Sequence, residues 1–174
     1  GTVANHTGDH AIIEYCDIEG ENFTVQANLM WKPTVCTSMA AAFKAAPGNL
    51  AERMMTALEA AQGEGGDVRG KQSAAILVVS GDPSAPAWGG RLFDLRVEDH
   101  DEPLVELRRL LRMAQAYQLM NDGDAFMTEG NIEAAITAYS GAEVLVPDSH
   151  EMIFWHAATL AAAGRVDESL PLFK

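Results

Sequence analysis

The alternation of apolar and polar residues predicts that the first half of the chain contains β-strands. Residues 23–29 (FTVQANL) place apolar side chains at every second position, as a half-buried strand does. Residues 73–80 (SAAILVVS) instead form a continuous apolar run, which is typical of a strand covered on both faces. Residues 91–98 (RLFDLRVE) alternate again and are expected to pair antiparallel with that run. Residues 1–7 are expected to form another short strand.

Apolar residues spaced by three and four positions predict two helices between these strands. The first is expected over residues 34–46, with Thr34 as its N-cap, and should end at Pro47-Gly48. The second begins at Asn49, where Glu52 three residues later completes a capping box, and it stops at the glycines of GEGG. Its buried stripe is expected to be Leu50, Met54, Leu58 and Ala61.

From Pro103 onward the chain has only helical periodicity. An acid, Asp101 or Glu102, caps the helix, and proline is well tolerated in the first turn. Neither Pro nor Gly interrupts the segment up to Gly123, and that glycine costs about 1 kcal/mol relative to Ala, too little to end a helix. We therefore expect one helix that runs unbroken to near Gly130. Its buried stripe is expected to be Leu104, Leu107, Leu111 and Ala114.

Small and aromatic residues recur with a period of 34 in the last third of the chain. This spacing relates Gly123 to Ala157, Phe126 to Leu160, Gly130 to Gly164, Ala135 to Ser169, and Tyr139 to Phe173. The pattern resembles that of tetratricopeptide repeats, in which small residues let two antiparallel helices cross closely. The first repeat matches the family pattern at Gly123, Phe126, Ala135, Tyr139, Ala142 and Pro147. The second stops inside its second helix. Ordinary helical hairpins are the alternative interpretation.

Composition and charge limit the possible function and location. With 48% hydrophobic residues the 174-residue chain can bury a core, and it contains no apolar run of 18 residues that would span a membrane. A net charge of −13 argues against nucleic acid as a partner. No basic region followed by an apolar stretch opens the chain, so no secretory leader is expected. Cys16 and Cys36 lack zinc-site spacing, so we expect free buried thiols in a reducing, cytoplasmic compartment.

One glycine-rich segment carries most of a phosphate-binding motif. In GGDVRGKQSAAILVV, residues 65–79, Gly65 and the Gly70-Lys71 pair have the spacing of a P-loop. A P-loop follows a strand and opens a helix, so that the helix amides face the phosphates. This segment instead follows a predicted helix and leads into a predicted strand, and Gln72 stands where Ser or Thr should bind magnesium. We therefore interpret the glycines as a tight loop and expect no nucleotide.

Five blocks of sequence occur in the order and spacing of a known family. They are HTG (6–8), FTVQANLM (23–30), LAERMMTALEAAQ (50–62), GGDVRGKQSAAILVV (65–79) and DLRVEDHDEPLVELRRLL (94–111). Together they resemble the domain of unknown function 1028 family, assigned to the Ntn-hydrolase superfamily. The resemblance implies an α+β fold, a four-layer α-β-β-α sandwich built on two antiparallel sheets. Residues 1–112 would form its C-terminal half, and the helical repeats would follow over residues 113–174.

The same resemblance implies hydrolysis of an amide bond. The characterised relatives use an N-terminal Ser, Thr or Cys, whose own α-amino group acts as the general base. That nucleophile would belong to the missing first half of the domain, so no catalytic residue is assigned and the chain itself is expected to be inactive. Thr2 would become N-terminal only if Gly1 were removed, and Ser73 has no histidine near it in sequence, so neither is a favoured nucleophile.

The candidate substrate-binding residues are polar groups at strand ends and in the glycine loop. Asp67 and Arg69 either hold a substrate carboxylate or lock the loop. Asn28 is either an oxyanion donor or a partner for backbone groups. His6 and Thr7 either transfer protons or stabilise a turn. The acidic run EDHDE, residues 98–102, is better explained by helix capping than by metal binding, so no metal and no cofactor are expected.

Two hypotheses of different classes follow. The chain is either part of an Ntn-type amidohydrolase of a small molecule, or a non-catalytic binding or scaffold protein whose helical repeats recruit a protein partner. The expected partners are accordingly a small amide or another protein, with nucleic acid and membranes excluded. Homo-oligomerisation is left open.

Overall fold

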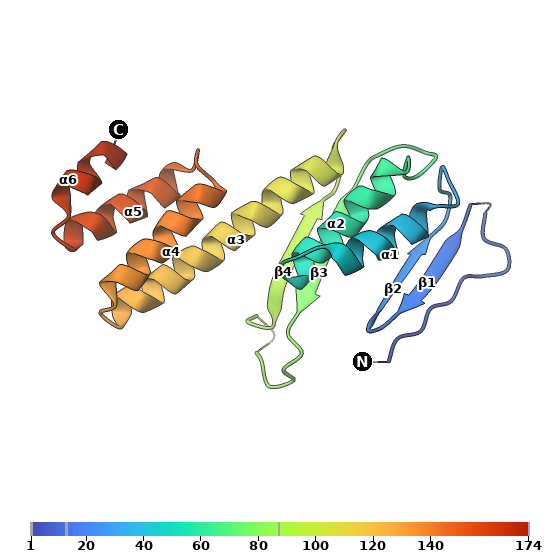
Figure 1. The fold of residues 1–174 in the computed structure, drawn as a ribbon, viewed down its shortest axis with the longest axis horizontal. Coiled ribbons are helices and arrows are strands. Elements are labelled where there is room, and N and C mark those ends of the chain that lie inside the picture. Colours follow the sequence, from blue (N-terminus) through green and yellow to red (C-terminus); the bar gives the residue numbers. More distant parts are fainter. Residues whose placement is uncertain (1, 13, 87, 174) are drawn as a thin grey trace. The chain divides into compact units, whose positions relative to one another are not determined.

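The structure is a computed structural model that describes residues 2–12, 14–86 and 88–173; Gly1, the first residue of the predicted strand 1–7, lies outside these ranges. The described residues form a mixed α and β fold with six α-helices and two antiparallel sheets of two strands each (Figure 1). The strands are β1 (Cys16–Gly20), β2 (Phe23–Ala27), β3 (Ala74–Val79) and β4 (Arg91–Val97). The helices are α1 (Val35–Ala45), α2 (Leu50–Gly63), α3 (Pro103–Thr128), α4 (Ile132–Leu145), α5 (His150–Ala162) and α6 (Val166–Ser169), followed by a 3-10 turn over Leu170–Phe173.

The chain divides into two compact units. Unit 1 covers Gly1–Arg108 and contains both sheets with α1 and α2, whereas unit 2 covers Arg109–Lys174 and is entirely helical. Helix α3 spans this boundary in the sequence and, as predicted, continues past Gly123 to Thr128. None of the described helices is long and apolar enough to cross a membrane.

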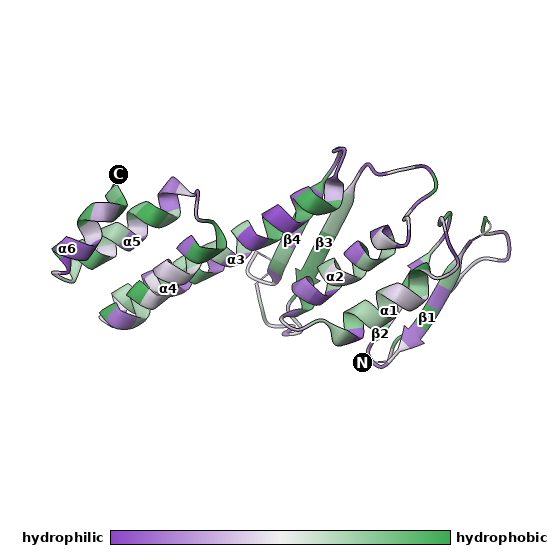
Figure 2. Ribbon diagram, turned by 45° about the horizontal axis from the view of Figure 1, so that its top comes forward, coloured by the Kyte–Doolittle hydropathy of each residue, from purple (hydrophilic) through white to green (hydrophobic). Residues whose placement is uncertain are grey.

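The β1–β2 hairpin packs on α1 through one apolar face. Ile18 pairs with Val25 in the antiparallel register, and both belong to a small core with Ala40 of α1. Asp17 and Glu19 are exposed, so exposed polar residues alternate with half-buried ones along β1 (Figure 2). The sequence analysis missed β1. It also extended β2 too far, because Leu29 adopts a φ of 58° and turns the chain away from the strand.

The strand predicted over residues 1–7 is wrong for the described part of that range, which has no regular secondary structure. The backbone N–H of Asn5 donates to Glu19 Oε1 at 3.1 Å, and Thr7 Oγ1 donates to Asp17 Oδ1 at 3.0 Å. The segment is thus tied to side chains of β1 rather than to its backbone, and no β-ladder forms.

Helices α1 and α2 lie side by side, and their caps follow the sequence only in part (Figure 1). Asn49 Oδ1 accepts from the N–H of Glu52 at 3.1 Å, which confirms Asn49 as the predicted N-cap of α2. The other half of the predicted capping box stays a prediction, and the Glu52 carboxylate accepts from Arg108 Nη1. Thr34 occupies the N-cap position of α1 but makes no side-chain cap bond. The predicted apolar stripe of α2 is wrong at Leu50, which is 48% exposed. The buried positions of α2 are Ala51, Met55 and Ala57.

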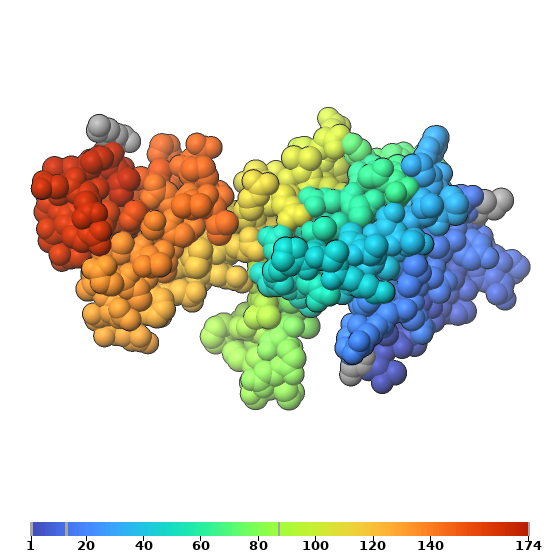
Figure 3. All heavy atoms as spheres, in the orientation of Figure 1, coloured from blue at the N-terminus to red at the C-terminus, as the bar shows by residue number. Residues whose placement is uncertain are grey.

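Strands β3 and β4 pair antiparallel, as predicted, but only one face of their sheet is covered. Ile76 and Val78 are buried on that face. On the other face Leu77 and Val79 are 52% and 59% exposed, so the expectation of a strand covered on both sides is wrong for this part of the chain. The loop between the two strands projects from unit 1 (Figure 3).

Unit 2 repeats one turn geometry after 34 residues. Gly130 and Gly164 follow α3 and α5 with φ values of 75° and 77°. The next residue in each case donates its N–H back into the preceding helix, Asn131 to Phe126 at 2.8 Å and Arg165 to Leu160 at 2.9 Å. A hydrophobic core in this unit contains Ala116, Met120, Ala135, Tyr139, Ala142 and Met152.

Gly123 has a packing role in that core. A Cβ at this position would lie 2.6 Å from the ring of Tyr139, so only glycine lets α4 approach α3 this closely. The Tyr139 hydroxyl donates to Asp124 Oδ1 at 2.6 Å. Burial, with a smaller contribution from Asp124, raises the pKa of Tyr139 to about 12.

Candidate functional site

A short segment after β2 is tied on both sides to distant parts of unit 1. The N–H of Met30 donates to the carbonyl of Glu14 at 3.1 Å. On the other side, Met30 forms an isolated antiparallel bridge with Asp67, and the N–H of Val68 donates to the carbonyl of Leu29 at 2.9 Å. The glycine loop is thereby fixed against the end of β2, which places candidate residues from two parts of the sequence close together.

Three of the predicted site residues line one cavity. His6, Thr7 and Asn28 lie around a space of about 290 Å³, which we call the N-terminal pocket. Thr7 is oriented by its hydrogen bond to Asp17, whereas His6 is exposed. The remaining lining residues are Gly8, Ala11, Gln26 and Ala27.

The other two predicted residues, Asp67 and Arg69, line a second cavity of about 680 Å³, which we call the loop pocket. Asn28 lines the N-terminal pocket and Met30 lines the loop pocket, so the segment after β2 contributes to the walls of both. The complete lining of the loop pocket is Met30, Leu58, Ala61, Gln62, Gly66, Asp67, Arg69, Gly70, Lys71, Gln72, Ser73, Asp99, Pro103 and Leu104.

Asp67 and Arg69 form a two-pronged ion pair within the loop. Arg69 Nε donates to Asp67 Oδ1 at 2.9 Å and Arg69 Nη2 donates to Oδ2 at 2.6 Å. The backbone N–H of Arg69 also donates to Oδ1, at 2.8 Å. The hydrogen bonds from Arg69 lower the pKa of Asp67, and Asp67 raises the pKa of Arg69. This geometry locks the loop and at the same time fixes the direction in which the guanidinium points.

The acidic run 98–102 lies next to the same loop. Lys71 Nζ donates to Glu102 Oε1 at 2.5 Å, and the N–H of His100 donates to the carbonyl of Gln72 at 2.9 Å. His100 Nδ1 accepts from the N–H of Glu102 at 2.9 Å, just before α3 begins. Within the described residues, no group of three or more His, Cys, Asp or Glu side chains is arranged to hold a metal ion.

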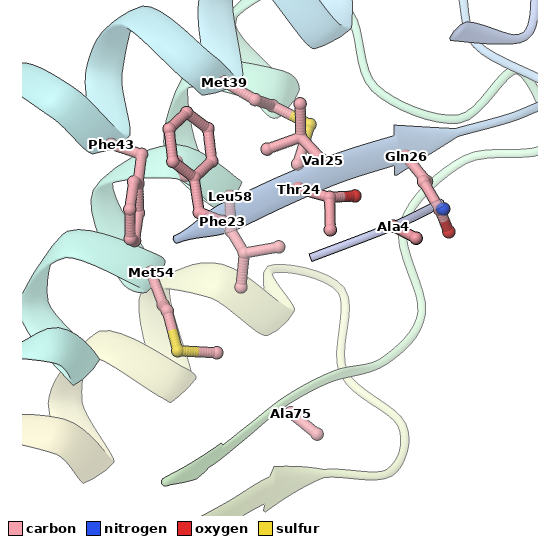
Figure 4. A pocket seen from close by; sticks show the side chains of 11 residues that line it. Ala4, Phe23, Thr24, Val25, Gln26, Met39, Phe43, Met54, Leu58 and Ala75 are labelled. Atoms are coloured by element: carbon pink, nitrogen blue, oxygen red, sulfur yellow. The ribbon is translucent and has the colours of Figure 1, made fainter. Parts of the chain in front are cut away.

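A third cavity, of about 510 Å³, is apolar and lies among β2, α1, α2 and β3 (Figure 4). The rings of Phe23 and Phe43 contact each other there at a tilt of 37°, with centroids 4.9 Å apart, and the guanidinium of Arg53 lies 4.2 Å from the Phe43 centroid. Met54 and Leu58 of α2 also line it, which explains why two residues of the predicted stripe are only half-buried. The other lining residues are Ala4, Thr24, Val25, Gln26, Met39, Ala57 and Ala75.

The comparison with known families decides the identity of unit 1. The model of the family of unknown function DUF1028 matches residues 1–107. The chain belongs to this family. A crystal structure of a DUF1028 protein from Silicibacter pomeroyi is similar to it, with 27% sequence identity and a TM-score of 0.50. The similarity covers 63% of this chain and 46% of that one, so the chain spans less than half the length of its structural relative. Among curated proteins there is no match.

The sequence analysis reached a wrong conclusion about the cysteines of this DUF1028 chain. Cys16 of β1 and Cys36 of α1 form a disulfide, with Cα atoms 5.9 Å apart. Cys36 is fully buried. A separation of 20 residues gave no signal of pairing, because the two cysteines meet only once the hairpin has packed on α1. Structural disulfides are typical of oxidising compartments, so the cysteines no longer support a cytoplasmic location.

Glu64 is a second feature that the sequence analysis missed in the DUF1028 unit. Its carboxylate accepts from Thr34 Oγ1 at 2.6 Å, from Ser38 Oγ at 3.1 Å and from Lys32 Nζ at 3.5 Å. The hydrogen bonds from Thr34 and Ser38 are the main cause of its lowered pKa. The residue ties the end of α2 to the start of α1, whereas the sequence indicated only that α2 stops at the neighbouring glycines.

Proposed function

We propose that the chain is part of an Ntn-type amidohydrolase of a small molecule, and that the nucleophile lies in a segment outside these 174 residues. The observation that carries the proposal is the pair of uncovered apolar surfaces in unit 1. One is the apolar cavity between β2 and β3, and the other is the exposed face of β3 with Leu77 and Val79. Surfaces of this kind are typical of interfaces, and a second half of an α-β-β-α sandwich would cover both.

In this proposal the residues of unit 1 bind substrate and stabilise charge. Asn28 lies at the end of β2, where its amide can donate to a developing oxyanion. His6 and Thr7 line the same pocket and supply groups for proton transfer. Oxyanion donors alone contribute on the order of a hundred- to a thousandfold in rate, well short of a full enzyme. The 174-residue chain by itself is therefore inactive toward amides.

An assay on small amides and lactams tests this proposal. The 174-residue chain is compared with a form extended at its N-terminus, and only the extended form is expected to turn over substrate. Comparable turnover by the shorter chain would contradict the assignment of the nucleophile and redirect attention to Thr2, Ser73 and Asp99-His100. Absence of turnover by both forms on the whole panel would count against a hydrolase.

A cluster of exposed aromatic residues in unit 2 favours a second candidate function, recruitment of a protein partner by tetratricopeptide-like repeats. Phe154 contacts Trp155 and Phe173 edge to face, with ring centroids 5.3 and 6.0 Å apart, and all three side chains are about half exposed. Exposed aromatic clusters mark binding surfaces. In a scaffold protein, Phe154→Ser would abolish partner binding while the extended form stays inactive on amides. In the hydrolase, the same substitution leaves turnover unchanged.

A further inference from the structure

We propose that the loop pocket binds the carboxylate of a small organic acid, and that Arg69 and Lys71 are the residues that hold it. The inference deepens the proposed function and rests on it in one respect, because it identifies the substrates of the hydrolase as amides that also carry a carboxylate. The binding itself is a property of the pocket and can be measured without any turnover.

The dimensions and lining of the pocket suit a small molecule with one polar end. Its volume of about 680 Å³ falls in the range of ligand sites. Met30, Leu58 and Leu104 form apolar parts of the wall, and the polar residues come from the loop 66–73, from Gln62 of α2 and from Asp99. The bridge between Met30 and Asp67 holds the start of the loop backbone in place, so this part of the wall is formed before a ligand arrives.

Asp67 orients the Arg69 guanidinium but does not occupy all of its N–H donors. Asp67 accepts from Nε and Nη2, and Arg69 Nη1 makes no hydrogen bond within the described part of the chain. The Arg69 side chain is 70% exposed, so Nη1 is accessible. Asp67 accepts three hydrogen bonds from Arg69, which occupy both of its oxygens. The pair thus offers free donors and few free acceptors, which favours an anionic group over a cationic one.

Lys71 adds a second positive charge two residues along the loop. One of its three N–H groups donates to Glu102, and its side chain is 34% exposed. A loop lock explains the pair of Asp67 and Arg69, but it does not require a lysine on the lining of the same cavity. Asp99 also lines the pocket, is exposed, and forms no hydrogen bond or ion pair with another described residue. Its negative charge opposes the binding of an anion. Removal of this charge should therefore strengthen the binding of the acid.

Calorimetry on the 174-residue chain tests the proposal with 4-methylpentanoate as the probe and 4-methylpentanamide as its neutral counterpart. We expect the acid to bind at least about fivefold more tightly than the amide, since charged hydrogen bonds are the stronger ones. Lys71→Gln and Arg69→Gln should each weaken binding of the acid about three- to tenfold. Asp99→Asn should strengthen it. Arg91→Gln is the matched control, because Arg91 is ion-paired with Asp94 and belongs to none of the three cavities described.

Thermal melts show which variants keep the fold, and if Arg69→Gln unfolds the loop, Lys71→Gln and Asp99→Asn decide the question. Equal binding of acid and amide would overturn the proposal, as would equal effects of Lys71→Gln and Arg91→Gln. Weaker binding of the acid to Asp99→Asn would also overturn it. The hydrolase proposal is judged separately with the N-terminally extended form. Binding without turnover would contradict the hydrolase and leave the pocket intact. If amides with and without a carboxylate are turned over equally well, the proposed substrate class is contradicted and the hydrolase proposal stands.

Discussion

The contacts inside unit 1 differ in kind from the contacts inside unit 2. Unit 2 packs through small residues along its helices, such as Gly123 against Tyr139, and its hydrophobic core brings together residues of the consecutive helices α3, α4 and α5. Unit 1 depends on links between distant positions, which are the disulfide, the tether of Met30 to Asp67, and the ion pairs of Arg108 with Glu52 and Glu59. It also leaves an apolar cavity and one sheet face uncovered.

The difference indicates how each unit reaches its stability. Contacts between neighbouring helices need little ordering of the intervening chain, whereas links across long stretches must first close a loop. A fold with many such links and open apolar faces is stable only if something else covers those faces or if covalent bonds restrict the unfolded chain. Unit 1 has one such covalent bond, the disulfide. In the function proposed above, a second half of the sandwich would cover its open apolar faces.

The largest effect is expected when unit 1 is separated from the rest of the chain. Residues 1–112 alone should show no cooperative thermal transition, because two two-stranded sheets with exposed apolar faces are marginal and prone to associate. The melt is recorded by circular dichroism, with the intact chain as control. A sharp transition from a monomeric fragment would show that the open faces are no obstacle to folding.

The disulfide gives the next largest effect. Replacing both Cys16 and Cys36 by Ser should lower the free energy of unfolding by about 2–4 kcal/mol, because the bond closes a loop between residues 20 positions apart. Denaturant titrations with and without a reducing agent measure this loss. Reduction should destabilise the original chain and leave the double variant unchanged. Two titratable thiols in the unfolded, unreduced protein would instead support the free cysteines that the sequence suggested.

The contrast between local and long-range contacts also separates the features that the sequence predicts from those that it does not. The cap at Asn49 and the unbroken helix from Pro103 were predicted because each depends on residues close together in the chain. The pairing of Cys16 with Cys36 was missed because it depends on how the hairpin packs. The apolar run 73–80 indicates that a strand forms, but an apolar residue on a strand does not specify what covers it.

In the candidate site, too, the sequence predicts what depends on neighbouring residues and not what depends on the fold. Polar residues at strand ends and in a glycine loop were recognisable one by one. Their division between two cavities was not, because it depends on the bridge between Met30 and Asp67. The ion pair of Asp67 with Arg69 joins residues two positions apart, so its formation was foreseeable. That the pair lines a cavity together with Lys71 and Asp99 could be seen only in the fold.

A matched pair of glycine substitutions tests the close packing of unit 2. Gly123→Ala places a methyl group 2.6 Å from the Tyr139 ring, whereas at Gly63 of α2 a methyl group meets nothing within 4 Å. Alanine favours the helix by up to about 1 kcal/mol at both sites, and overpacking costs about 1–3 kcal/mol at the first site only. The free energies of unfolding of the two variants should therefore differ by about 1–3 kcal/mol, with Gly123→Ala the less stable. Equal values would mean that α4 can shift away from α3 without cost.

The smallest effect is expected at Glu64, and it should depend on pH. Hydrogen bonds from Thr34 and Ser38 lower the pKa of Glu64 in the folded chain, so its ionised form stabilises unit 1 above the ordinary glutamate pKa. That contribution is lost as the pH falls through the lowered value. Glu64→Gln should therefore destabilise the chain slightly at neutral pH, and the difference from the original should disappear in strong acid. Denaturant titrations from pH 7 downward measure this, with Glu21→Gln in the exposed β1–β2 turn as control. A difference of the same size at both ends of the range would mean that the shape of the Glu64 side chain, rather than its charge, joins α2 to α1.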